Sequence, residues 1–139
     1  MKLAMIHFSF PIRDIESTLA FYRDLLGCTA TRVQDDRIDF EFFGHHLVAQ
    51  LSEVEAAHRS VNIGKDNYPL RHFGVIVEPG DYDSMLNRLR QAKVPFAMEP
   101  TRIFIGTPRE QTVFLVLDPS GNAIEVKGLL QPSQVFSTQ

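Results

Sequence analysis

The stretch Asp118-Pro119-Ser120-Gly121-Asn122-Ala123-Ile124-Glu125-Val126 has the composition of a tight turn followed by a short apolar strand. Within that strand Glu125 stands among hydrophobic neighbours. An ionised glutamate is almost never buried unless it is paired or bound to a metal ion. The sequence therefore predicts that Glu125 meets a cation or a metal.

Two other apolar, strand-like runs each carry one histidine. His7 lies in Ile6-His7-Phe8-Ser9-Phe10, and His72 lies in Arg71-His72-Phe73-Gly74-Val75. Two imidazoles and one carboxylate form a common metal ligand set. A lone histidine in a strand is more often a hydrogen-bonded core or edge residue, so the metal hypothesis depends on how the three residues are arranged.

The two halves of the chain repeat one pattern. Each histidine-bearing strand ends at a proline, and the pattern Asp-x-x-Ser-x-Leu follows at Asp14 and again at Asp81, 67 residues later. Asp14 is a good helix N-cap, and both segments carry apolar residues at i, i+4 and i+7. The repeat predicts one helix in each half, ending near Gly27 and near Lys93.

Strand signals follow each predicted helix, so each half has the pattern βαβββ. We expect an α+β fold of two tandem βαβββ modules that form a curved mixed sheet. We treat 1–139 as a single domain, with module 1 at about 4–52, a linker at 53–68, module 2 at about 69–128 and a tail at 129–139. The expected later strands are 29–33, 38–43 and 46–51 in the first half, and 96–98, 102–105, 111–117 and 122–127 in the second.

The fourth strand of the first half offers possible partners for the metal set. If the turn glycines Gly44 and Gly121 are superposed, Glu125 corresponds to Val48; in another register it corresponds to Gln50. Both registers keep the same strand face. Gln50 and His46 therefore stay candidates.

The composition excludes several classes of function. A net charge of −3 gives no electrostatic reason to expect nucleic acid as a partner. No apolar run approaches the roughly 20 residues that cross a membrane, and we expect a cytoplasmic protein because the N-terminus lacks signal-peptide features. The single cysteine, Cys28, is interpreted as a packing residue.

The repeat, the two early histidines and the element Asp-Pro-x-Gly-Asn-x-Ile-Glu at 118–125 resemble the vicinal oxygen chelate superfamily of glyoxalase I, bleomycin-resistance proteins and extradiol dioxygenases. The resemblance covers about residues 4–128. It implies a cup-shaped sheet that holds a divalent metal, with His7, His72 and Glu125 matching the ligand positions. It also implies a small-molecule substrate and a homodimer.

The resemblance leaves the branch of the family open. Enzymes of the glyoxalase I type use four ligands, whereas the fourth strand here offers Gln50 or His46 and no glutamate. Two histidines and one carboxylate are the facial triad of non-haem Fe(II) oxygenases. We therefore favour a dioxygenase-like oxidoreductase with Fe(II), with Mn, Ni, Co or Zn as other possible metals. The alternatives are a glyoxalase-type lyase or isomerase and a non-catalytic, bleomycin-resistance-like binding protein.

Other side chains are candidates for roles around the metal. His46 has the chemistry of a proton donor or acceptor, although the pair His45-His46 also fits an exposed hairpin turn. Candidate pocket residues are apolar or aromatic, with one arginine to bind an anion; with 11 phenylalanines in the chain, most of them are core by default. These pocket candidates are Phe40, Phe42, Tyr68, Phe104, Phe114 and Arg109.

Overall fold

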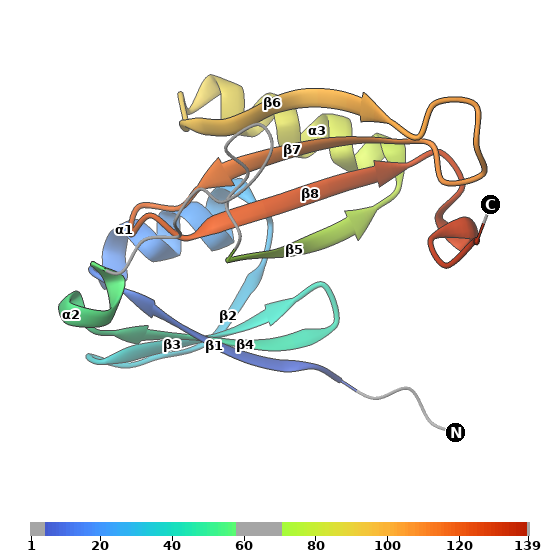
Figure 1. Cartoon of the computed structure of the whole chain (residues 1–139). Helices are drawn as coiled ribbons and strands as arrows, with labels where there is room; N and C mark the ends of the chain where they lie inside the picture. Colours follow the sequence, from blue (N-terminus) through green and yellow to red (C-terminus); the bar gives the residue numbers. More distant parts are fainter. Residues whose placement is uncertain (1–4, 58–70, 139) are drawn as a thin grey trace. The chain divides into compact units, whose positions relative to one another are not determined.

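The computed structural model describes residues 5–57 and 71–138 (Figure 1). It confirms the α+β fold, with two four-stranded mixed sheets and one βαβββ module for each. The chain divides into two compact units, and each is described by itself. Unit 1 contains the first module and, in addition, Asp118–Gly121; unit 2 contains the second module and the C-terminal segment.

The sheet of unit 1 has the strand order β1-β4-β3-β2, in which β1 runs parallel to β4 and the other neighbours are antiparallel. Side chains on one face of this sheet form the core with Tyr22, whose ring centroid lies 5.4 Å from Phe10 and 5.3 Å from Phe40. The other face carries polar residues. The elements are β1 (His7–Ile12), α1 (Ile15–Leu19), η1 (Ala20–Leu25), β2 (Thr29–Val33), β3 (Arg37–Phe42), β4 (His45–Leu51) and α2 (Glu53–Ala56).

The first helix begins as the sequence predicts, because the Asp14 carboxylate accepts a hydrogen bond of 2.6 Å from the backbone N–H of Ser17. From Ala20 the helix widens to π-helical geometry, in which Leu26 N donates to Phe21 O at 3.0 Å. The apolar spacing did not predict this widening. The helix ends at Leu25, with Leu26 as its C-cap, close to the end predicted near Gly27.

The turn Asp118–Gly121 is part of unit 1 although it follows a strand of unit 2. Tyr22 Oη donates a hydrogen bond of 2.9 Å to Asp118 Oδ2, and both residues are buried. The backbone N–H of Arg13 donates to Ser120 Oγ at 2.8 Å, and Ser120 N donates to Asp118 Oδ1 at 2.9 Å. Asp118 and Ser120 therefore satisfy polar groups inside unit 1.

Unit 2 repeats the arrangement with the strand order β5-β8-β7-β6, and β5 runs parallel to β8. Helix α3 covers one face of this sheet (Figure 1), burying Tyr82, Met85 and Leu89. The Tyr82 ring packs 5.0 Å from the Phe114 ring. The elements are β5 (His72–Val77), α3 (Pro79–Gln91), β6 (Phe96–Ile103), β7 (Gln111–Leu117), β8 (Ala123–Leu129) and the 3₁₀ turn η3 (Pro132–Gln134).

Two details of unit 2 differ from the sequence-based expectation. Helix α3 begins at Pro79, two residues before Asp81, because proline has the backbone angle of a first helical turn and needs no N–H partner there. The segments 96–98 and 102–105 are one strand, β6, which ends at Ile103. Its pairing with β7 shifts register between Met98 and Thr101, around Pro100, which cannot donate to a strand ladder.

The turns before β4 and β8 correspond closely. Gly44 and Gly121 have φ values of 86° and 85°, a left-handed conformation that favours glycine. Two residues after Gly44, His46 pairs with His7 of β1. Two residues after Gly121, Ala123 pairs with His72 of β5. No helix within the described ranges is long and apolar enough to cross a membrane.

Candidate metal centre

His72 and Glu125 meet on the face of the unit 2 sheet that lies opposite helix α3. They reach each other because β5 and β8 are parallel neighbours, with Gly74 beside Glu125 and His72 two residues earlier on the same face. His72 Nε2 lies 3.1 Å from Glu125 Oε2. Glu125 is 8% exposed, so its carboxylate is buried and paired, as its place in an apolar strand predicts.

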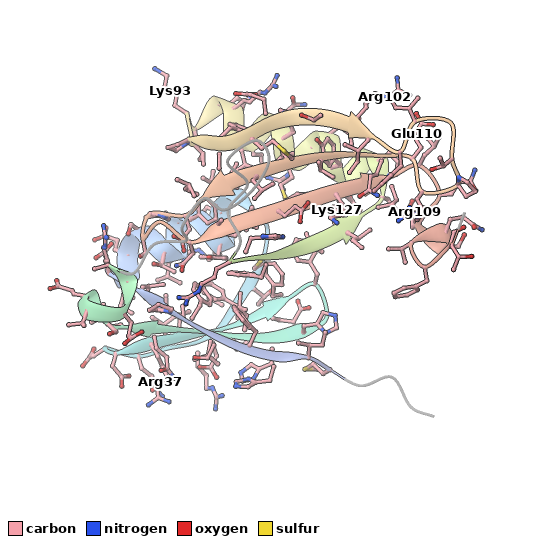
Figure 2. The ribbon with its side chains drawn as sticks, viewed as in Figure 1. Arg37, Lys93, Arg102, Arg109, Glu110 and Lys127 are labelled. Atoms are coloured by element: carbon pink, nitrogen blue, oxygen red, sulfur yellow. The ribbon has the colours of Figure 1, made fainter. Side chains whose placement is uncertain are left out.

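Lys127 lies beside this pair. Its Nζ is 3.7 Å from Glu125 Oε1, and its side chain projects from β8 (Figure 2). A small pocket of about 180 Å³ is lined by Glu125 and Lys127 together with Gly74, Val75 and Ile76. Sequence reasoning missed Lys127, although its position two residues after Glu125 places it on the same strand face.

The polar face of unit 1 carries a chain of three side chains. His7 Nδ1 lies 2.9 Å from His46 Nδ1, and His46 Nε2 lies 3.2 Å from Asp39 Oδ2. Arg32 donates to the same Asp39 oxygen. Burial acts to raise the pKa of Asp39, but hydrogen bonds from Arg32 and His46 outweigh it and lower the pKa.

This chain fixes how the His7 ring is presented. Metal-binding histidines usually engage a second group through the ring nitrogen that does not bind the metal. For His7 that contact uses Nδ1, which leaves Nε2 for a ligand. Asp39 was missed by sequence reasoning, although it is an acidic residue inside the apolar run Ile38-Asp39-Phe40, just as Glu125 is in its own strand.

The strand registers identify the counterpart of Glu125 in unit 1. Val48 pairs with Ser9 on β1 as Glu125 pairs with Gly74 on β5, and each follows its turn glycine by four residues. The carboxylate of unit 2 therefore has an apolar equivalent. Gln50, the possible fourth ligand, corresponds instead to Lys127; it pairs with Pro11 and is exposed.

The candidate pocket residues separate into two groups. Phe40, Phe42 and Phe114 are buried core residues, and Phe40 and Phe114 contact Tyr22 and Tyr82 on the helix-covered faces. They therefore do not line the opposite faces of the two sheets, on which the candidate metal ligands lie. Phe104 and Arg109 lie between β6 and β7, where the Arg109 guanidinium stacks 4.3 Å from the Phe104 ring centroid. Tyr68 lies outside the described residues.

The donor atoms of unit 2 fit a divalent metal ion, because imidazole nitrogen and carboxylate oxygen are both ordinary ligands of first-row transition metals. His72 supplies the nitrogen and Glu125 the oxygen, and these two atoms, Nε2 and Oε2, lie 3.1 Å apart. Over residues 5–57 and 71–138, no group of three or more His, Cys, Asp or Glu side chains is close enough to hold a metal. His7 as the third ligand stays a prediction.

Cys28 has the environment of a packing residue. It is buried, and burial together with nearby Glu41 raises the pKa of its thiol to about 12. Since only the thiolate is an effective nucleophile, this cysteine is poorly suited to catalysis.

Comparisons with known proteins agree with this architecture. The family model described as Glyoxalase/Bleomycin resistance protein/Dioxygenase superfamily matches residues 4–126. No curated protein matches the chain. Among solved structures, a glyoxalase/bleomycin resistance protein/dioxygenase from Alicyclobacillus acidocaldarius is 32% identical, with a TM-score of 0.72 and 94% of each chain covered.

Two more distant structures show the same fold. The fosfomycin resistance protein FosX of Listeria monocytogenes is 12% identical, with a TM-score of 0.72; 92% of this chain and 94% of that chain are covered. Lactoylglutathione lyase of Agrobacterium tumefaciens is 19% identical, with a TM-score of 0.64, and the coverage is 90% and 92%.

Proposed function

Because this chain belongs to the Glyoxalase/Bleomycin resistance protein/Dioxygenase superfamily, we propose that it is a divalent-metal-dependent enzyme acting on a small substrate with two adjacent oxygen ligands. Members of the family generally depend on a divalent metal, bind small molecules and often form dimers. Within the family we favour a dioxygenase-like oxidoreductase that uses Fe(II), assembled as a homodimer.

The contact between His72 and Glu125 is the observation that carries this proposal. A buried carboxylate faces an imidazole nitrogen at 3.1 Å, on the face of its sheet opposite helix α3 and beside a small pocket. Buried carboxylates need a cation, a strong hydrogen-bond donor or a metal. His72 and Glu125 would hold the metal, and His7 is the proposed third ligand.

Val48 supports a three-ligand set over the four-ligand set of glyoxalase-type lyases. The position equivalent to Glu125 carries a buried valine, which has no donor atom, and Gln50 corresponds to a different position. Three protein ligands leave coordination positions for substrate and dioxygen. This is why we favour the oxygenase over the lyase.

The protein side chains would prepare the site. When bound, the metal would act as a Lewis acid that holds and polarises the substrate oxygens. Asp39 and His46 orient the His7 ring through contacts of 3.2 and 2.9 Å. We propose that His46, as the middle member of this chain, also moves a proton to or from the substrate.

Metal analysis of untagged protein, purified anaerobically and without chelator, tests the proposal. We expect about one Fe per chain, or about one metal ion bound after anaerobic reconstitution, together with oxygen uptake on catechol-like substrates. About one Ni or Zn per chain, with no oxygen uptake, would instead favour a lyase. No metal after reconstitution would overturn the metalloenzyme and favour a binding protein.

Matched variants test the ligands. Glu125→Gln and His72→Ala are each expected to lose stoichiometric metal, whereas Glu99→Gln and His45→Ala, which change the same residue types elsewhere, keep it. Glu99 is exposed on β6, and His45 accepts a hydrogen bond from Ile6 N at the start of β4. Full metal binding in Glu125→Gln or His72→Ala would exclude that residue as a ligand.

Gln50→Ala separates the two branches of the family. We expect this variant to bind metal like the wild type, since Gln50 does not occupy the position of Glu125. A loss as severe as that of Glu125→Gln would support the four-ligand lyase.

A further inference from the structure

We propose that Lys127 binds an anionic group of the substrate, so that the preferred substrates are small oxygen chelators that carry a second negative charge, either a carboxylate or a phosphoryl group. This inference rests on the proposed metal site, because Lys127 acts here beside Glu125. It goes further by assigning a specificity-determining residue and a substrate class.

The position of Lys127 gives the first argument. Its Nζ lies 3.7 Å from Glu125 Oε1, close enough for electrostatic attraction but longer than a hydrogen bond. In the part of the chain that the structure describes, this ammonium makes no hydrogen bond. Its three N–H donors are therefore available for a ligand.

The surroundings of Lys127 give the second argument. Its strand neighbours on the same face are the apolar residues Ile76 and Val113, and its ion-pair partner among the described residues is Glu125. The Lys127 side chain is 35% exposed, and it lines the pocket of about 180 Å³ with Glu125. A small ligand in this pocket would contact the ammonium and the carboxylate together.

The charge balance gives the third argument. In the protein alone, Glu125 is the neighbouring anion that balances Lys127. If Glu125 binds a divalent metal, the metal ion neutralises the Glu125 carboxylate, and Lys127 no longer has an anion that balances its charge. A second anionic group on the substrate then restores the balance, and an ammonium–carboxylate contact in a partly buried pocket is stronger than one in water.

A simpler role for Lys127 would be to neutralise Glu125 without contacting a ligand. The two roles predict different effects of Lys127→Met. If Lys127 only neutralises Glu125, the variant changes metal affinity and leaves the preference among ligands unchanged. If it binds the substrate, the variant loses the preference for a doubly charged chelator.

Lactate and malate are suitable probes, since both carry a hydroxyl group next to a carboxylate and malate adds a second carboxylate. Dissociation constants for both would be measured by calorimetry on metal-loaded wild type, Lys127→Met, Lys127→Arg and Lys93→Met. Lys93 is exposed after helix α3 (Figure 2), so Lys93→Met removes the same charge away from the pocket.

We expect the wild type and Lys93→Met to bind malate about tenfold more tightly than lactate, the size of one charge-assisted contact. In Lys127→Met the two constants should become nearly equal, and Lys127→Arg should keep most of the difference. An unchanged malate preference in Lys127→Met, or no preference in the wild type, overturns the inference while the metal site stands. A wild type that binds no metal after anaerobic reconstitution overturns both the proposed metal site and this inference.

Discussion

Gly74 and Glu125 are so close that residue 74 has no room for a side chain. A Cβ atom built on Gly74 would overlap the backbone carbonyl oxygen of Glu125, its partner across β5 and β8. The strand that carries the buried carboxylate therefore packs directly against a bare backbone. This contact fixes β8 at the residue on which the proposed metal site depends.

Gly74→Ala is expected to destabilise the protein by about 1–3 kcal/mol or more, because backbone must move to admit the methyl group. It should also weaken metal binding, since Glu125 moves with its strand. Urea unfolding and a metal titration measure the two effects.

Gly80→Ala is the control for this change. Gly80 lies in helix α3 and has no atom within 4 Å of an added Cβ, so alanine should be neutral or stabilise the helix by up to about 1 kcal/mol. Equal stability of the two variants would contradict the close packing at Gly74.

Tyr22→Phe is expected to lower the free energy of unfolding by about 1–3 kcal/mol. The change removes the hydrogen bond from the Tyr22 hydroxyl to Asp118 Oδ2, which joins two buried side chains. Urea denaturation with fluorescence or circular dichroism measures the loss.

Tyr82→Phe is the matched control, because Tyr82 is also buried but its hydroxyl has no hydrogen-bond partner among the described residues. Its removal should cost nothing or stabilise the protein slightly. If both variants lower the free energy of unfolding by the same amount, the Tyr22–Asp118 hydrogen bond does not stabilise the protein as predicted.

Alkaline pH should lower the free energy of unfolding because Tyr22 is buried. Burial, and then the nearby Asp118 carboxylate, raise the pKa of Tyr22 well above its ordinary value of 10.0. A group whose pKa is higher in the folded than in the unfolded state contributes its full stabilisation to the folded protein at a pH below the unfolded-state pKa. For Tyr22 this stabilisation is lost as the pH rises above about 10. The unfolding free energy of the wild type, measured from pH 8 to 11, should therefore fall. The difference in unfolding free energy between the wild type and Tyr22→Phe should become smaller over the same range, and a constant difference would contradict this.

Cys28 should be unreactive in the folded protein. Its thiol is buried, and burial raises the pKa to about 12, so almost no thiolate is present at pH 8. Ellman's reagent is expected to modify the native protein very slowly and to titrate one thiol after unfolding in urea. Rapid modification of the native protein would place Cys28 at the surface.

The sequence predicted that His72 and Glu125 are candidate ligands because strand alternation and the internal repeat can both be recognised in the order of residues. Asp39 and Lys127 were missed, although each lies on the same face as a predicted residue, because their contacts depend on side-chain reach and strand pairing. The choice between Val48 and Gln50 could not be made from the sequence. Both share one strand face, and only the pairing of β1 with β4 separates them.

The aromatic residues show another limit of the sequence. Phe40 and Phe114 have the residue type expected in an apolar pocket, but the same type fills the core, and here they pack under the helices. Hydrophobicity alone does not specify which apolar environment a side chain occupies. The shift within β6 around Pro100 likewise depends on its partner strand.

The membership of Asp118–Gly121 in unit 1 has a consequence for the order in which the protein matures during synthesis. The ribosome completes β1 to β4 by Leu51, but the acceptor for the Tyr22 hydroxyl is made 96 residues after Tyr22. Contacts of such long sequence separation form late and slow folding. The first module is therefore synthesised early but completed late, and a nascent chain that ends after β4 has a Tyr22 hydroxyl without its Asp118 acceptor.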